Sequence, residues 1–194
     1  MTTDRSEGWN DIAGHFLGAR QAIGATLVRG WARDHLRPAG DILDVACGHG
    51  VPIAQALIEA GFRVFGVDAS PLLLAEFHRR FPGMPSACER AQDSTFFHRT
   101  FDGVISIGLL FLLGADDQRL LLRRMAEALN PGGHLLFTAP LQVLEWPDSL
   151  TGRTSRSLGA QAYQEILEFS GLRLVGCSSD EGENNYFHAA APPG

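Results

Sequence analysis

The chain has 194 residues, 45% of them hydrophobic, which is enough for one domain with a full core and short for two. Its formal net charge is -6, and its 16 arginines, which make up the whole of its Lys and Arg content, do not gather in one run. Both features argue against a nucleic-acid-binding protein, which normally has a basic surface. The three cysteines lack CxxC spacing, which argues against a disulfide framework or a cysteine zinc cluster and fits a reducing cytoplasm.

The first 40 residues predict a helical cover. Residues 1–10 are polar, without the apolar core of a signal peptide, and the longest apolar run, 104–113, is too short to span a bilayer. From Trp9 to Asp34 apolar residues recur at helical spacing, which predicts two helices packed ahead of a sheet. We therefore expect a cytoplasmic protein without membrane contact.

A buried strand that ends in a glycine turn organises the chain. The apolar run 42–46 is typical of a central parallel strand with helices on both faces. Gly48 and Gly50 follow, and because they lack a Cβ a ligand can lie against the main chain, facing free N–H groups of a helix that begins near Pro52. The alternative is a tight turn that binds nothing.

The spacing Asp44-x-Ala46-x-Gly48-x-Gly50 resembles the first motif of the class I S-adenosylmethionine-dependent methyltransferases, with Ala46 in place of a glycine. A dinucleotide-binding turn requires a third glycine where this chain has Ile53. The resemblance implies an α/β fold: a Rossmann-like, seven-stranded, mostly parallel sheet with helices on both faces and an antiparallel C-terminal hairpin.

A helix over 52–60, ended by Gly61, is predicted to lead into a strand over 63–67 that runs into Asp68. A carboxylate at this strand end can accept hydrogen bonds from both hydroxyls of a ribose. Asp68 as the cap of the helix opening with Ser70-Pro71 is the structural alternative. The resemblance implies that Ala69 and Leu73 border an adenine ring.

A short strand over 86–88 is followed by the charged segment 89–93, where the family holds the adenine base. The resemblance points to Arg90 and Ala91, while the acidic neighbours are Glu89 and Asp93. Which of these side chains reaches the base stays open, and a solvated charged loop is the alternative for each.

The segment 101–110 resembles the fourth methyltransferase motif, a buried strand beneath the reacting centre, with Ser106 and Ile107 at its active-site end. The apolar residues after it are expected to wall a substrate pocket or to pack in the core; they are Leu110, Phe111 and Leu112. The next helix is predicted to start at a cap, Asp116, and to bury Leu120, Leu121, Met125, Ala128 and Leu129. A turn over 130–133, similar to the family's turn into strand five, then leads to a strand over 134–139.

Residues 140–157 show no clear periodicity and are expected to form an irregular lid that selects the substrate. Ser157 is predicted to cap a helix that runs to Ser170 and is ended by Gly171. A strand over 172–177 and a hairpin connection into 186–190 complete the chain.

The division expected is one methyltransferase domain over 1–194, with a helical cover (1–40), a cofactor-binding core (41–139), a lid (140–157) and a terminal helix and hairpin (158–190). The expected cofactor, S-adenosylmethionine, leaves as S-adenosylhomocysteine. Its expected contacts are Asp44, Ala46, Cys47, Gly48, Gly50, Asp68, Ala69, Leu73, Arg90, Ala91, Ser106 and Ile107. Candidate acceptor contacts are Trp9, Phe111, Trp146 and Tyr186, with Phe16 and Arg20 as further lid candidates.

The sulfonium methyl group of this cofactor is already a strong electrophile, so the protein has chiefly to align a nucleophile and exclude water. No metal is required, and the seven histidines lack a metal-ligand spacing. The weak candidates for a general base are His15, His49, Glu145 and Glu181, each of which also has a structural explanation. A small-molecule acceptor and a monomer or homodimer are expected. The alternatives are a silent cofactor-binding regulator, an aminopropyl transferase and a nicotinamide enzyme; Ile53 and the lack of a paired-aspartate motif argue against the last two.

Overall fold

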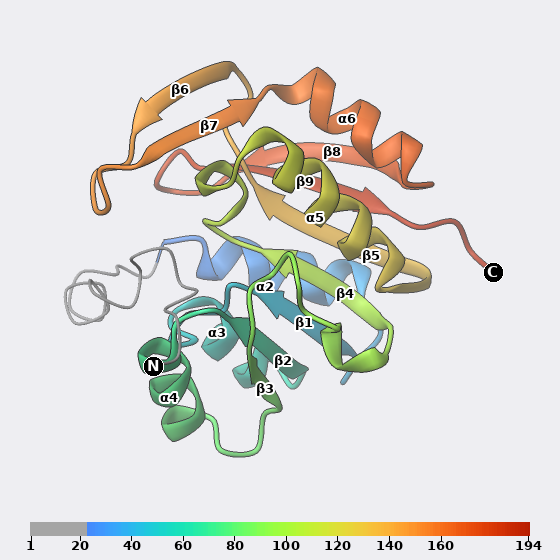
Figure 1. The fold of residues 1–194 in the computed structure, drawn as a ribbon. Coiled ribbons are helices and arrows are strands. Elements are labelled where there is room, and N and C mark those ends of the chain that lie inside the picture. Colours follow the sequence, from blue (N-terminus) through green and yellow to red (C-terminus); the bar gives the residue numbers. More distant parts are fainter. Residues whose placement is uncertain (1–22) are drawn as a thin grey trace.

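A computed structural model describes residues 23–194 of the protein. Its centre is a seven-stranded sheet with the order β3-β2-β1-β4-β5-β9-β8 (Figure 1). The strands are β1 (Asp41–Val45), β2 (Arg63–Asp68), β3 (Ser86–Cys88), β4 (Phe101–Ser106), β5 (Leu129–Thr138), β8 (Arg173–Ser179) and β9 (Asn185–Ala190). The first five are parallel, and β9 is antiparallel to both its neighbours. The predicted α/β architecture, with its C-terminal hairpin, is confirmed.

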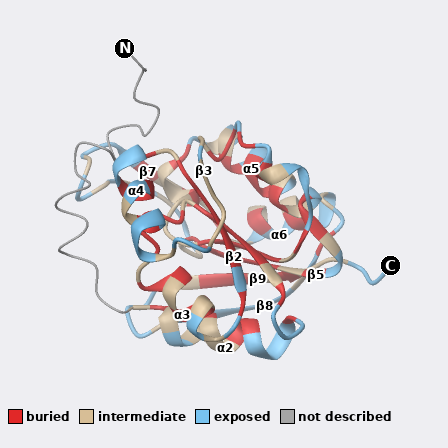
Figure 2. Cartoon of the chain, turned by 90° about the horizontal axis from the view of Figure 1, so that it is seen from below, coloured by how far each residue is buried: buried red, intermediate tan, exposed pale blue. Residues whose placement is uncertain are grey.

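Helices cover both faces of the sheet because successive strand residues point to opposite sides. Ile42 faces the cluster of α2 (Ala25–His35), α3 (Ile53–Glu59) and α4 (Pro71–Arg80). Its neighbour Leu43 faces the cluster of α5 (Ala115–Glu127) and α6 (Ala160–Phe169). Two short 3-10 helices, η1 (Phe96–His98) and η2 (Leu110–Leu112), flank β4. The central strands β1, β2 and β4 are accordingly buried between the helix layers, whereas the edge strand β8 is largely exposed (Figure 2).

The predicted starts of two helices are wrong. The N-cap of α5 is Gly114, and Asp116 lies within the first helical turn, where its carboxylate still favours the positive helix end. The N-cap of α6 is Gly159, not Ser157. The Ser157 hydroxyl instead donates to the Pro140 carbonyl at 2.7 Å and accepts from the Gly159 amide at 3.1 Å. Ser157 lies one residue before the end of a strand, and its two hydrogen bonds stabilise the turn between that strand and the helix.

The buried face of α5 also differs from the prediction. Leu120 is 38% exposed, whereas Leu121, Leu122 and Met125 are buried. The strand that follows begins at Leu129 instead of residue 134, and its pairing with β4 shifts register before His134. The Pro-Gly-Gly stretch is the irregular part of the strand, so pairing is regular only from His134 onward.

The segment expected to be an irregular lid is a β-hairpin. It consists of β6 (Val143–Pro147) and β7 (Thr154–Leu158), which pair only with each other within residues 23–194. Exposed Val143 and Glu145 alternate with half-buried Leu144 and Trp146, the period of two that the sequence prediction overlooked. The hairpin stands beside α6 at one edge of the molecule (Figure 1).

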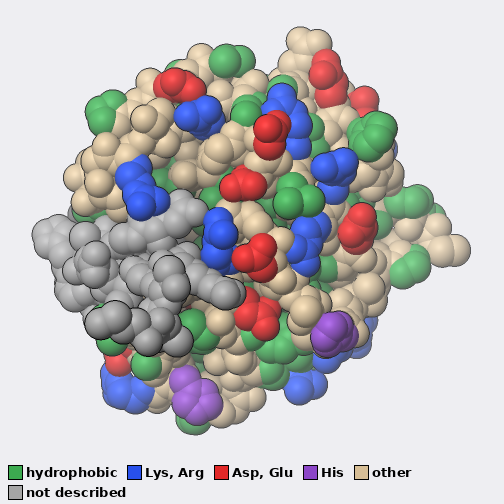
Figure 3. Space-filling model, in the orientation of Figure 1, with side chains coloured by type: hydrophobic (Ala, Val, Ile, Leu, Met, Phe, Trp, Pro, Cys, Tyr) green, Lys and Arg blue, Asp and Glu red, His purple; other side chains and the backbone are tan. Residues whose placement is uncertain are grey.

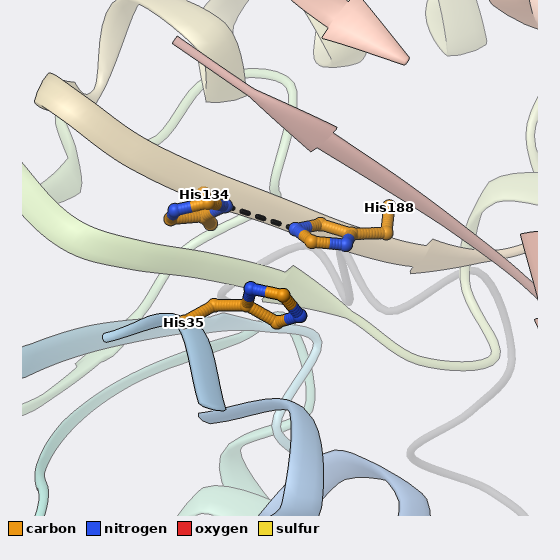
Figure 4. A group of neighbouring side chains, drawn as sticks. All are labelled: His35, His134 and His188. Atoms are coloured by element: carbon orange, nitrogen blue, oxygen red, sulfur yellow. Dashed lines mark hydrogen bonds between the residues drawn. The ribbon is translucent and has the colours of Figure 1, made fainter. Parts of the chain in front are cut away.

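A group of histidines interrupts the apolar face beneath α2. His134 Nδ1 and His188 Nε2 lie 2.9 Å apart, and the ring centroid of His35 lies 4.4 Å from that of His188 (Figure 4). Burial lowers the pKa of His134, and burial together with the neighbouring His35, His134 and Arg173 lowers the pKa of His188 to about 4. Both strand imidazoles are therefore neutral at pH 7.

Candidate functional site

The turn after β1 is held in place by the end of β2. The amides of Ala46 and Cys47 donate to the Val67 carbonyl at 2.7 and 3.1 Å. Ala46, Gly48 and Gly50 all have positive φ, at 65°, 55° and 82°. A left-handed alanine costs about 1 to 2 kcal/mol, so Ala46 occupies a glycine-type position at the expense of stability. This geometry matches the alternating pattern read from the sequence.

Gly50 is required for packing as well as for backbone conformation. A Cβ atom at this position would lie 2.5 Å from a ring carbon of Phe81 and 2.8 Å from one of Phe77. Both rings belong to the end of α4, so the turn fits closely against that helix. The sequence predicts that Gly50 contacts a ligand. The structure shows in addition that a side chain at this position would overlap with Phe77 and Phe81.

Asp68 joins the glycine turn to the start of α4. Its Oδ2 accepts the Gly48 amide at 2.8 Å, and its Oδ1 accepts the Ser70 amide at 2.8 Å. The cap of α4 is Ser70, whose hydroxyl oxygen accepts the Leu73 amide at 3.3 Å. Asp68 is therefore not the N-cap residue, although it orders the residues around it. Its carboxylate also lines a cavity.

This cavity has a volume of about 320 Å³ and lies at the carboxyl ends of the parallel strands. Its lining includes Ala46 and Gly48 from the glycine turn and Asp68 and Ala69 from the end of β2. Leu73 of α4 also lines it. Ligands of open α/β sheets bind in this position, where the loops diverge. A volume of about 300 to 1,000 Å³ is typical of a small-molecule site.

One wall of the cavity is the segment that follows β3. Glu89, Arg90, Ala91 and Gln92 line it, whereas Asp93 does not and lies 3.8 Å from the Arg90 guanidinium. The Gln92 side chain was not predicted; its Nε2 donates to Asp117 Oδ2 at 3.2 Å. The guanidinium of Arg124, on α5, donates to the carbonyls of Gln92 and Ser94.

These bonds from α5 hold the main chain of the wall in place at Gln92 and Ser94. No sequence pattern links Arg124 to this segment, since the contact is long-range and uses backbone oxygens.

The other predicted cofactor contacts fall into two groups. Asp44, Cys47, Gly50 and Ile107 line a small second hollow that shares Ala46 and Ile107 with the main cavity. Ser106 lines neither, because its buried hydroxyl donates to the Val45 carbonyl at 3.2 Å and ties β4 to β1. Burial, with Asp44 and Asp68 adding to it, raises the pKa of the Cys47 thiol well above its usual range. Cys47 is thus an uncharged wall residue.

The far wall of the cavity is apolar and leads to the β6–β7 hairpin. Leu109, Phe111, Leu112 and Leu113 line it, and the Phe111 ring lies 5.7 Å from the ring of Trp146 on β6. Gly108, which precedes these residues, has a φ of 87°. Its backbone amide donates a hydrogen bond to Thr138 Oγ1 at 2.8 Å. Trp146 supports the wall through Phe111 and does not line the cavity itself.

The tip of the hairpin, which belongs to the segment predicted to select the substrate, closes this wall with polar groups. Leu150, Thr151 and Arg153 line the cavity together with Asp148. Asp148 Oδ1 accepts the amides of Leu150 and Thr151 at 3.1 and 2.7 Å, and also the Thr151 hydroxyl at 2.7 Å. Asp148 therefore folds the tip by capping its own turn.

The candidate bases within the described residues do not reach the cavity. Glu145 is exposed and lies 3.4 Å from Arg156, and Glu181 Oε1 accepts the Gly24 amide at 3.1 Å. Tyr186, a predicted acceptor contact, is buried and donates to Asp180 Oδ2 at 2.9 Å. His49 is buried within the turn. The predictions for Trp9, His15, Phe16 and Arg20 lie outside the described residues.

Comparisons with known proteins agree with this geometry. A family model described as a methyltransferase domain matches residues 42–133. A curated relative, trans-aconitate 2-methyltransferase of Methylobacterium nodulans, is 28% identical over 83% of this chain and 71% of its own. A tRNA U34 carboxymethyltransferase of Cellvibrio japonicus is 32% identical over 50% of this chain, which spans only 31% of that protein.

Among solved structures, the 1,6-didemethyltoxoflavin-N1-methyltransferase of Burkholderia thailandensis, with bound 1,6-didemethyltoxoflavin and S-adenosylhomocysteine, has a similar fold. Its TM-score is 0.75 at 17% identity, covering 95% of this chain and 84% of that one. At this identity the likeness establishes the fold. Within residues 23–194, no helix is both long and apolar enough to cross a bilayer.

Proposed function

Residues 42–133 match a family model described as a methyltransferase domain, the fold is similar to that of solved methyltransferases, and from this premise we propose that the chain transfers a methyl group from S-adenosylmethionine to a small organic acceptor. The observation that carries the proposal is the cavity itself. It combines a left-handed turn, a carboxylate at the end of β2 and an apolar wall in one space of about 320 Å³.

We assign the cofactor to the half of the cavity bounded by the glycine turn and Asp68. The Asp68 carboxylate is held beside the glycine turn, because Oδ2 accepts the Gly48 amide and Oδ1 accepts the Ser70 amide, and a carboxylate at the end of β2 is the group that binds a ribose in open α/β sheets. Ala69, Leu73 and Ala91 offer the apolar borders that an adenine ring needs, while Glu89 and Gln92 offer polar groups at its edge. Ser106 is left out of this assignment because its hydroxyl bonds to β1.

We assign the acceptor to the half between η2 and the hairpin tip. When bound, the cofactor supplies a methyl group on a sulfonium, so the protein has to orient the acceptor and keep water away. Leu109, Leu112, Leu113 and the Phe111 ring provide an apolar surface, whereas Leu110, a predicted wall residue, packs in the core. Thr151 and Arg153 provide polar groups in the same cavity. This arrangement suits an acceptor with an apolar body and one polar or anionic edge.

The carboxylates in the wall are Asp68, Glu89 and Asp148, among the described residues. Each already accepts a backbone amide, Asp68 from Gly48, Glu89 from Thr95 and Asp148 from Thr151, which makes all three poor general bases. We therefore propose an acceptor whose nucleophile has a free lone pair on arrival, such as a neutral amine, a thiol or an enolate. Proximity and orientation can then supply roughly 7 to 11 kcal/mol of the barrier reduction.

A small acceptor is favoured over a nucleic acid by the charge distribution. The formal net charge is -6, and arginines and carboxylates are interspersed on the face drawn in Figure 3. A tRNA-binding surface requires a continuous cationic stripe. The trans-aconitate relative, matched over most of this chain, also acts on a small molecule according to its name.

The proposal is tested by titrating the purified protein calorimetrically with S-adenosylmethionine, S-adenosylhomocysteine and NAD, followed by a screen of acceptors by mass spectrometry. Binding of the first two, without NAD, and a product 14 Da heavier than one acceptor are the expected results. Binding of NAD alone would overturn the cofactor assignment.

A silent cofactor-binding protein is the second candidate, because no described candidate base reaches the cavity. Cofactor binding without turnover on amines, thiols or enolates would favour that alternative over the enzyme.

A further inference from the structure

Three histidines from distant parts of the chain converge on one point, away from the cavity. His35 is the last residue of α2, His134 lies on β5 and His188 on β9 (Figure 4). One ligand nitrogen from each ring lies within 4.8 Å of the other two. The proposed methyl transfer uses none of them.

The sheet fixes two of these rings. In the antiparallel pairing of β5 with β9, His134 lies opposite Ala190 and His188 opposite Leu136, so the two histidines are diagonal neighbours. Residues two apart on a strand share a face, and Leu136 and Tyr186 both belong to the cluster beneath α2. Both imidazoles therefore point toward α2, and their facing nitrogens, Nδ1 of His134 and Nε2 of His188, are 2.9 Å apart.

The third ring comes from a more adaptable position. His35 is exposed at the C-terminal end of α2, where the unpaired carbonyls of a helix carry a partial negative charge that favours a cation. Its ring centroid is 5.3 Å from that of His134 and 4.4 Å from that of His188. An ion would reach the group from this exposed side, and a water molecule could complete its coordination.

We propose that His35, His134 and His188 bind one divalent transition-metal ion of the zinc class and thereby fasten the end of α2 to β5 and β9. Neutral imidazole nitrogens suit Zn²⁺, Co²⁺, Ni²⁺ and Cu²⁺, and the absence of a carboxylate from this described group disfavours Mg²⁺ and Ca²⁺.

The distances are close to those that such an ion requires. Tetrahedral zinc with bonds of about 2.0 to 2.1 Å separates its ligand nitrogens by about 3.3 Å. The strand pair has to open by about 0.4 Å, and the His35 nitrogen has to approach by no more than about 1.5 Å, which a side-chain rotation at a helix end supplies. Arg173 is the group outside the three histidines whose charge lowers the pKa of both His134 and His188, and this positive charge opposes cation binding.

The test uses the full chain without a histidine tag, freed of metal with EDTA and then dialysed. Calorimetric titration with ZnCl₂ measures stoichiometry and affinity, and the visible absorption of added Co²⁺ reports tetrahedral coordination. We expect one ion per chain with a dissociation constant below about 1 µM. At a free Zn²⁺ concentration one hundred times the dissociation constant, the melting temperature of the protein should rise by about 5 to 10 °C.

Variants locate the ion. His35→Gln and His188→Gln should each weaken zinc binding by at least about tenfold, because each removes one of three ligands. His78→Gln, which changes an exposed histidine on α4, is the matched control and should leave the affinity unchanged. If His188→Gln fails to fold, His35→Gln decides alone, since that side chain is exposed.

The proposal is overturned if the untagged protein binds no Zn²⁺ at 100 times the expected dissociation constant. It is equally overturned if both ligand variants bind the ion as tightly as the original chain. These outcomes are independent of methyl transfer, which the cofactor titration tests separately.

Discussion

The two ends of the sheet are built in opposite ways. At the amino end, Asp102 at the start of β4 accepts hydrogen bonds from Arg37 Nε at 2.9 Å, the Asp41 amide at 2.8 Å and Asn130 Nδ2 at 3.1 Å. Arg99 pairs with Asp41 beside them. One carboxylate thus joins the segments that enter β1, β4 and β5.

At the carboxyl end, β1 and β4 lead into turns instead. Ala46 and Gly48 after β1 and Gly108 after β4 have positive φ, and all three residues line the cavity. The contrast teaches that the closed end carries stability, so that the open end can hold strained backbone and ligand-facing polar groups.

The largest expected loss of stability comes from a substitution in the glycine turn, and a matched control separates steric overlap from backbone strain. Gly50→Ala, at the open end, should lower the free energy of unfolding by about 3 to 5 kcal/mol, because left-handed strain adds to the overlap with Phe77 and Phe81. Gly61→Ala, before β2, has a similar φ of 92° and no atom within 4 Å of the added Cβ, so it should cost only about 1 to 2 kcal/mol. Urea denaturation measures both. Equal losses would contradict the close fit of the turn against α4.

Removing the carboxylate at the closed end should cost stability and spare the cavity. Asp102→Ala should lower the free energy of unfolding by about 2 to 3 kcal/mol, because the Asp41 amide and the Asn130 side chain lose their acceptor. The affinity for S-adenosylmethionine should stay within about twofold. A folded variant with a large loss of cofactor affinity would show that the two ends are coupled.

The reciprocal change acts at the open end. Asp68→Ala should weaken binding of S-adenosylmethionine by about 1.5 to 3 kcal/mol, or roughly 10- to 150-fold, through loss of the bonds proposed to the ribose. Asp93→Ala, outside the cavity wall, is the matched control. Calorimetry on folded protein decides, and an unchanged dissociation constant would remove Asp68 from the site.

Acid should weaken the closed end selectively. Burial alone would raise the pKa of Asp102, but the bonds from Arg37, Asp41 and Asn130 outweigh it and hold that pKa below its ordinary value of 3.8. The stability that this carboxylate adds is complete above pH 3.8 and is lost as the pH falls through its lower, folded-state pKa.

The difference in the free energy of unfolding between the original chain and Asp102→Ala should therefore shrink as the pH is lowered from 5 to about 2.5, as measured by urea denaturation at each pH. Curves that stay parallel over this range would exclude Asp102 as the titrating group.

The sequence predicted those parts of the fold that depend on local chemistry. The run 42–46 and its glycines define a buried strand and turn, and both lie where expected. Gly61 and Gly171 end their helices with left-handed φ values of 92° and 77°, because glycine tolerates this conformation best. The order of strands and helices followed from these local signals and from the resemblance to a family.

The errors have long-range causes. Ser157 looks like a helix cap in sequence, but its hydroxyl bonds to Pro140 across the hairpin. The alternation of residues 143–147 was overlooked because the ribbon is short and half exposed. The histidine group and the bonds of Arg124 bring together residues that are far apart in the sequence, so no local pattern predicts these contacts. The assignment of single residues to cofactor and acceptor stays a prediction.

The β6–β7 hairpin has a consequence for how this protein can change. Among the described residues, its two strands form a sheet only with each other, so their backbone ladder is separate from the seven-stranded sheet, while the tip between them borders the cavity. A different tip, longer or with another charge, can be grafted between Pro147 and Thr154 while the register of the central sheet is kept. Evolution and protein engineering thus have the same exchangeable part available for altering the cavity wall that we propose binds the acceptor.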